Sequence, residues 1–222
     1  MQHKDYFDSI KNKTLQELSL KELAFIHLNG RDCSEIKGEL LHSILPVVIR
    51  EIRHAKFQIY SQNFLPLAAA FTVLDQLGFC YSRNDMATFS SNNASAIKKS
   101  LYYFCGFGDN DQDTKALYAL RNSFLHTSSL LSKGEWTNQP NYRFVFDRKC
   151  ETMIKHPQIN WDGDFNNLQT NMTTYINPDS VVEMVEDTIH KALELLFEDK
   201  LVVTCADGEA EFYYRFLKRS AK

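Results

Sequence analysis

One stretch of the chain, from Leu65 to about Leu77, is apolar on nearly every side of the helix that its composition predicts. It opens with the run Leu-Pro-Leu-Ala-Ala-Ala. A helix without a polar face has to be covered by other elements all round. The sequence therefore predicts a central buried helix that ends at Gly78. With 222 residues, the chain is long enough to surround this helix with a sizeable core.

A second helical pattern lies before the central helix. From Ser34 to Ile52, apolar residues recur every three or four positions, which is the spacing of one helix face. Pro46 lies inside the pattern and removes a backbone donor. We therefore expect either a kink there or two helices that meet at residue 45.

The other helices are predicted largely from their ends. Ser19-Leu20-Lys21-Glu22 has capping-box spacing and predicts a short helix that ends near Asn29-Gly30. Asn177-Pro178 supplies an N-cap and a proline at the first helical position. The expected helices cover residues 94–104, 114–131 and 179–198.

Strand signals are few and lie late in the chain. Residues 142–147 carry aromatic side chains at every second position, and a further short strand is expected near residues 173–175. We therefore predict a mainly α protein, an antiparallel helical bundle with a small β insertion before its last long helix. The expected parts are an N-terminal helical segment (1–33), a helical domain (34–200) with the β or loop insertion at about 135–176, and a C-terminal tail (201–222). Both helix and strand fit the tail.

Composition narrows the function classes. The formal net charge of −3 argues against broad, non-specific coating of nucleic acid, although it allows a small local basic cleft. The five cysteines are scattered and odd in number, which makes a disulfide framework improbable. The N-terminus does not resemble a signal peptide, and no apolar run reaches membrane-spanning length. We expect a soluble, cytoplasmic protein without membrane contact, and no histidine spacing predicts a metal or cofactor site.

The segment from Arg121 to His126 has the most specific chemistry in the chain. On the predicted helix 114–131, Asn122, His126 and Ser129 follow one another at spacings of four and three residues, so they share a polar face beside Arg121. Histidine can take a proton from a ribose 2′-hydroxyl or give one to a leaving oxygen. Arginine matches phosphate oxygens and keeps its charge as negative charge develops. This set suits cleavage of RNA without a metal.

Basic residues elsewhere could add to such a site. Ser129 and Lys133, close to the motif, are the predicted substrate-binding residues. Five further cations could gather with them into a local positive patch, or could equally be ordinary surface charges. They are Lys98, Lys99, Lys115, Arg143 and Arg148.

The sequence Arg121-Asn122-Ser123-Phe124-Leu125-His126 resembles the R-N-x-x-x-H signature of HEPN domains, which occur in prokaryotic toxins, phage-defence proteins and CRISPR-associated nucleases. The likeness extends over roughly residues 36–131, with helix 179–198 as a possible closing member. It implies a metal-independent endoribonuclease that acts as a homodimer, with paired Arg and His side chains in one composite site and often a 2′,3′-cyclic phosphate product. His126 would be the acid/base, Arg121 the phosphate and transition-state stabiliser, and Asn122 a polar helper.

The resemblance also implies a setting in phage defence or in a toxin–antitoxin system, where an antitoxin or other regulatory partner restrains the activity. Two other interpretations stay open. The chain could be a non-catalytic HEPN-like helical module for binding or dimerisation, because a fold does not fix a function. Arg121 and His126 could also be surface residues of a helix that pair with acidic side chains or cap nearby backbone.

Overall fold

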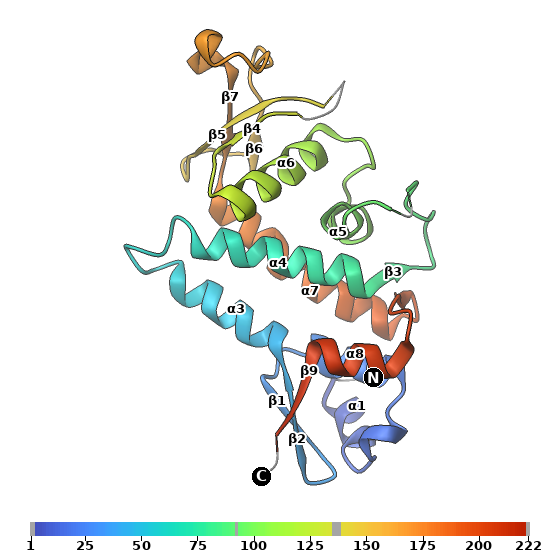
Figure 1. The fold of residues 1–222 in the computed structure, drawn as a ribbon. Helices are drawn as coiled ribbons and strands as arrows, with labels where there is room; N and C mark the ends of the chain where they lie inside the picture. The colour runs from blue at the N-terminus through green and yellow to red at the C-terminus, as the bar shows by residue number, and fades with distance from the viewer. Residues whose placement is uncertain (1–2, 92, 135–138, 221–222) are drawn as a thin grey trace.

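The computed structural model describes residues 3–91, 93–134 and 139–220 (Figure 1). It shows an α/β protein with 51% helix, 16% strand and three sheets, so the prediction of a mainly α bundle is wrong. The helices are α1 His3–Ile10, α2 Leu20–Leu28, α3 Ile44–Ala55, α4 Leu65–Cys80, α5 Ala96–Cys105, α6 Gln112–Thr127, α7 Pro178–Phe197 and α8 Gly208–Phe216. The strands are β1 Cys33–Ile36, β2 Glu39–Ser43, β3 Tyr81–Arg83, β4 Leu131–Ser132, β5 Tyr142–Phe146, β6 Ile154–Lys155, β7 Thr173–Ile176, β8 Leu201–Val203 and β9 Leu217–Ser220. Short 3₁₀ helices cover Leu15–Glu17, Phe165–Asn167 and Thr170–Met172.

The central helix is confirmed. Helix α4 packs against α3, α5, α6 and α7 (Figure 1). Its side chains Phe71, Leu74 and Leu77 are completely buried. The helix does not end at Gly78, however, but continues to Cys80. A Cβ atom at position 78 would lie only 1.9 Å from the backbone oxygen of Ala96 in α5. The glycine is therefore explained by close helix packing and not by helix termination.

Residues 33–43 form a β-hairpin where the apolar pattern predicted a helix. Lys37 and Gly38 have positive φ angles of 45° and 82°, which suit the two central residues of a tight hairpin turn. The hairpin is extended by β9, which pairs antiparallel with β2 from the far end of the chain. Of the predicted helical stretch 34–52, only the part within α3 is helical. Pro46 lies in the first turn of α3, where its missing N–H costs nothing.

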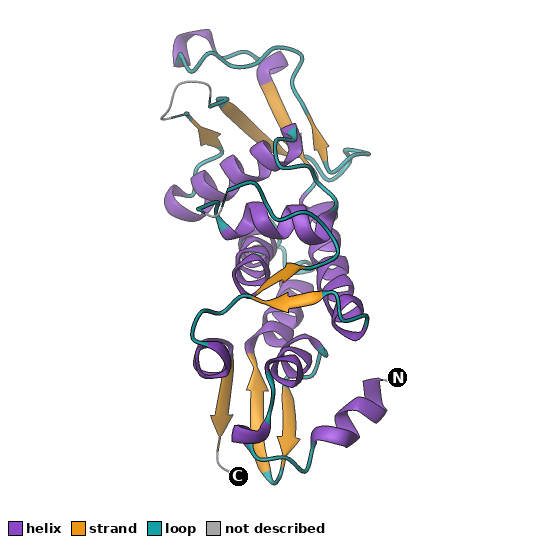
Figure 2. Ribbon diagram, turned by 90° about the vertical axis from the view of Figure 1, so that its right-hand side faces the viewer, coloured by secondary structure: helices purple, strands orange, loops and turns teal. Residues whose placement is uncertain are grey.

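The late strands are confirmed and join a larger sheet than expected. β5 and β7 pair in parallel, with β4 and β6 at the two edges in the order β4-β5-β7-β6. The first residues of the predicted insertion, 135–138, lie outside the described part of the chain. Figure 2 shows the three sheets at separate levels along the molecule, with helices between them. α6 lies between the four-stranded sheet and helices α4 and α5.

The two ends of the chain are tied into the core. α2 begins with the predicted capping box, in which the Glu22 carboxylate accepts from the backbone N–H of Ser19 at 2.9 Å, and it packs against α3, α7 and α8. The C-terminal tail contains both a helix and a strand, the two alternatives that the sequence left open, since α8 precedes β9.

All five cysteines are free thiols. Among the described residues, no helix combines the length and apolar content needed to cross a membrane.

Candidate active site

Helix α6 carries the motif, and its burial pattern decides which side chains are available. Ala116, Leu117, Leu120 and Phe124 are buried against the core, which leaves the opposite face accessible. The helix ends at Thr127 and not at 131, because Ser128 takes a left-handed C-cap conformation with φ 52°. The motif therefore lies in the last turns of the helix, on its accessible side.

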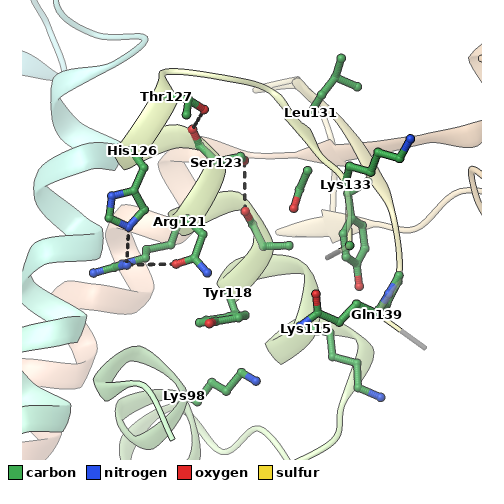
Figure 3. A pocket seen from close by; sticks show the side chains of 16 residues that line it. Lys98, Lys115, Tyr118, Arg121, Ser123, His126, Thr127, Leu131, Lys133 and Gln139 are labelled. Atoms are coloured by element: carbon green, nitrogen blue, oxygen red, sulfur yellow. Dashed lines mark hydrogen bonds between the residues drawn. The ribbon is translucent and has the colours of Figure 1, made fainter. Parts of the chain in front are cut away.

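Arg121, Asn122 and His126 come together as the sequence predicted (Figure 3). The Nη1 group of Arg121 donates to Oδ1 of Asn122 at 3.0 Å and lies 3.3 Å from Nε2 of His126. An arginine N–H can only donate, so Nε2 of His126 acts as the acceptor in this contact. The neutral imidazole then carries its proton on Nδ1.

Asp75 of α4 holds the other edge of the same guanidinium. Its Oδ2 accepts from Nε of Arg121 at 2.8 Å and from Nη2 at 2.6 Å. Both side chains keep only about a quarter of their surface exposed, 24% for Arg121 and 23% for Asp75. Asp75 lies within the predicted central helix, and the sequence predicted no role for it. The pair links two residues 46 positions apart, a distance at which sequence spacing carries no signal.

A cleft of about 710 Å³ opens beside the motif, between α6, the first turn of α5 and the β4–β5 side of the sheet. Figure 3 shows Arg121 and His126 on one side of this space and Lys133 across it. Hydroxyl and amide groups of Asn122, Ser123 and Gln139 also line it. The cleft is large enough for a nucleotide-sized ligand.

The cleft is positively charged although the chain as a whole is acidic. Of its described lining residues, four are cationic and none is a carboxylate; the cations are Lys98, Lys115, Arg121 and Lys133. The Lys98 ammonium lies 4.2 Å from the ring centre of Tyr118, a cation–π contact that places this charge over an aromatic wall. Such a concentration of cations attracts anions such as phosphate groups.

His126 is the single histidine among the described lining residues, and its side chain is exposed. Tyr142 also lines the cleft, and burial raises the pKa of its phenol to about 12. This phenol therefore stays protonated at neutral pH and is a hydrogen-bond donor, not a base. His126 is thus the lining side chain best suited to act as a general acid and base.

The two predicted substrate-binding residues have different outcomes. Lys133 lines the cleft, and its Nζ also lies 5.8 Å from the ring centre of Phe165. Ser129 does not line it, because the helix ends two residues earlier. Its hydroxyl instead donates to the backbone oxygen of Leu131 at 3.1 Å and accepts from the Leu131 N–H at 3.0 Å. Ser123, which had no assigned role, does line the cleft, and its hydroxyl donates to the backbone oxygen of Ala119 at 3.0 Å.

The predicted positive patch is partly assembled. Lys98 and Lys115 join Lys133 at the cleft, whereas Lys99, Arg143 and Arg148 are not among its lining residues. Arg148 is instead bound to Asp179 and to the loop before α4. Among the described residues, no three His, Cys, Asp or Glu side chains gather as a metal site would require.

Comparison of the chain with protein-family models, with curated proteins and with solved structures finds no match in any of the three.

Proposed function

We propose that this protein is a metal-independent endoribonuclease of HEPN type. Support comes chiefly from one arrangement, in which Nη1 of Arg121 contacts both Asn122 and Nε2 of His126 at the edge of a basic cleft whose described lining residues include no carboxylate. The motif and the cleft support this activity. The fold gives no such support, because it is α/β and not the helical bundle that the sequence predicted. The second interpretation, a purely structural ion pair, explains the Asp75–Arg121 contact but not the four cations around the cleft.

The chemistry follows from the groups in place. A phosphodiester in the cleft would be held by Arg121 and the lysines, and its oxygens would compete with His126 for Nη1. The freed Nε2 then takes the proton of the ribose 2′-hydroxyl as the 2′-oxygen attacks phosphorus. The bond from phosphorus to the 5′-oxygen breaks, and that oxygen receives the proton from the imidazolium. The products are a 2′,3′-cyclic phosphate and a 5′-hydroxyl, and His126 is neutral again.

The proposal includes a homodimer, for which the loop between α3 and α4 provides support. Phe57 is 84% exposed and Tyr60 98% exposed, and Ile59, Phe64 and Leu65 also show apolar surface to solvent. Together they offer on the order of 700 Å², against about 800 Å² per partner in a standard interface. Phe64 also packs against Phe124 of α6, with ring centres 4.5 Å apart, so this surface adjoins the motif helix.

Two further features favour a second copy of the chain as the partner that covers this loop. Turn hydrogen bonds such as the one from the Ser61 N–H to the Gln58 oxygen at 2.9 Å order the loop, whose apolar side chains are exposed to solvent. Cations around it are already paired within the chain, so two copies would not repel each other there. These pairs are Arg53 with Glu186, Lys56 with Glu183, and Arg148 with Asp179. A role in phage defence or beside an antitoxin, and a cytoplasmic location, are expectations from the resemblance and the sequence.

Cleavage of a synthetic RNA in EDTA tests the activity. The wild type and His190→Ala, which removes an exposed histidine of α7 that does not line the cleft, should cut. His126→Ala and Arg121→Lys should lose at least about a hundredfold in rate, because they remove the proton carrier and the phosphate fork. Mass spectrometry should find the cyclic phosphate. An inert wild type, or a His126→Ala variant as active as the wild type, would count against the proposal.

Light scattering of the eluted protein tests the dimer. We expect two copies in the wild type and one in a Phe57→Ser/Tyr60→Ser variant. Phe165→Ser, which changes an aromatic side chain that is 62% exposed elsewhere, is the matched control and should stay dimeric. A wild type that is monomeric at tens of micromolar would contradict the proposed dimer without bearing on the cleavage chemistry.

A further inference from the structure

Asp75 lies behind the candidate site and is not among the residues that line the cleft. Among the described residues, it is linked to the site through Arg121, whose Nε and Nη2 both donate to one oxygen of the carboxylate. The guanidinium group is planar and rigid, so fixing one edge also fixes the direction of the other. The free edge carries Nη1, which lies 3.3 Å from Nε2 of His126.

We propose that Asp75 is a positioning residue for the ribonuclease reaction: it orients Arg121 so that Nη1 donates to Nε2 and selects the His126 tautomer that carries its proton on Nδ1. This role rests on the proposed function. With the proton on Nδ1, Nε2 is already in the form that can accept the 2′-hydroxyl proton. Without the carboxylate, the Arg121 side chain can take other rotamers, and His126 loses the donor that fixes its tautomer.

The ion pair between Asp75 and Arg121 has a second consequence, which concerns substrate binding. Asp75 balances much of the charge of Arg121, so Lys98, Lys115 and Lys133 carry most of the attraction for an incoming phosphate. Arg121 then acts mainly where the phosphate gains charge, next to His126. Loss of Asp75 should therefore lower kcat while KM changes little, since the lysines that bind the substrate stay in place.

The chain contains a closely matched control. Arg83 and Asp85 form a pair of the same kind, with Nε to Oδ1 and Nη2 to Oδ2 both at 2.8 Å. Their side chains are 21% and 25% exposed, nearly as for Arg121 and Asp75, and neither lines the cleft. Asp85→Asn thus removes an equivalent charge from an equivalent pair elsewhere in the fold.

The test compares the wild type, Asp75→Asn and Asp85→Asn by two measurements. Nitrogen-15 NMR of the histidine side chains at pH 8.5, with His126 assigned from His126→Ala, reports which ring nitrogen carries the proton. We expect the Nδ1–H form in the wild type and in Asp85→Asn, and a mixture with the Nε2–H form in Asp75→Asn. Steady-state cleavage should show kcat reduced by about ten- to a hundredfold in Asp75→Asn alone, with KM within about threefold.

The outcomes separate this inference from the proposed function. An Asp75→Asn protein that is folded and keeps the wild-type tautomer and kcat would overturn the positioning role. So would an Asp85→Asn protein that loses as much activity as Asp75→Asn, because the effect would then follow general stability. If the wild type does not cut RNA but the tautomer responds only to Asp75→Asn, the ribonuclease proposal fails, and the orientation of His126 by Asp75 through Arg121 is supported.

Discussion

Replacing Gly78 by alanine should destabilise the protein, although alanine is the better helix former. Glycine inside a helix costs about 1 kcal/mol relative to alanine, so local propensity alone predicts a gain of that size. Against this, the new Cβ would lie 1.9 Å from the oxygen of Ala96, 2.7 Å from its carbonyl carbon and 2.8 Å from the backbone nitrogen of Ser100. All three atoms are backbone, so no side chain can turn aside to make room.

The magnitude follows from the movement that the methyl group demands. α4 and α5 would have to separate by at least about 1 Å at their closest approach, in an interface packed to crystalline density. Overpacking of this kind costs typically about 1–3 kcal/mol, and the backbone location favours the upper end. After the propensity gain is subtracted, we expect a net loss of about 2 kcal/mol. For a chain of this size that lowers Tm by roughly 4–8 °C.

Thermal and urea unfolding followed by circular dichroism measure this loss. The exposed position Thr72 in the same helix supplies the control, because the difference between Thr72→Gly and Thr72→Ala gives the propensity term without the contact. An unchanged or raised Tm for Gly78→Ala would refute the account, since α5 would then be able to move away at no cost. Normal stability together with altered cleavage would place the effect of Gly78 on the site instead.

Three further outcomes are expected. Burial lowers the pKa of His27 to about 3, so between pH 6.5 and 3 the unfolded chain binds more protons, and stability falls as pH falls, by about 1.4 kcal/mol per unit. Urea unfolding at pH 7.5 and 5.0 should therefore show a loss about 2 kcal/mol larger in the wild type than in His27→Phe, and equal losses would contradict this assignment. Lys115→Gln/Lys133→Gln should weaken binding of a single-stranded RNA and reduce the slope of log K against log salt by about 1.4; an unchanged slope would mean that these lysines do not touch phosphate. Ser129→Ala should leave the cleavage rate within about twofold of wild type, because its hydroxyl is bound to Leu131, and a large drop would return this residue to the site.

Several helix and strand boundaries follow from capping residues and backbone preferences of neighbouring residues, so they could be predicted from the sequence. The capping box at Ser19 starts α2, Asn177 and Pro178 start α7, and Gly106 ends α5 with φ 77°. Each of these signals concerns hydrogen bonds or φ angles of neighbouring residues, so the sequence contains all the information that decides it. The alternating aromatic residues of β5 belong to the same group, since strand periodicity is also local.

The candidate site likewise combines residues that helix geometry brings together with residues that only tertiary contacts bring together. Arg121, Asn122 and His126 lie within six residues on one helix, and helix geometry brings them together whatever surrounds them. Asp75 reaches Arg121 from another helix, and Lys98 reaches the cleft from a third. Spacing along the chain predicts neither contact, because each depends on how α4, α5 and α6 cross.

The sequence by itself thus determined the central buried helix, several helix boundaries and the grouping of Arg121, Asn122 and His126 on α6. Tertiary structure alone decided that residues 33–43 form strands, because β2 gains its partner β9 from the opposite end of the chain. It likewise decided that Gly78 serves a helix crossing and that Asp75 faces Arg121. The physical reason is common to all three: a local pattern fixes the conformations that a segment can adopt, whereas contacts between distant segments choose among them, and their free energy outweighs the small differences in local propensity.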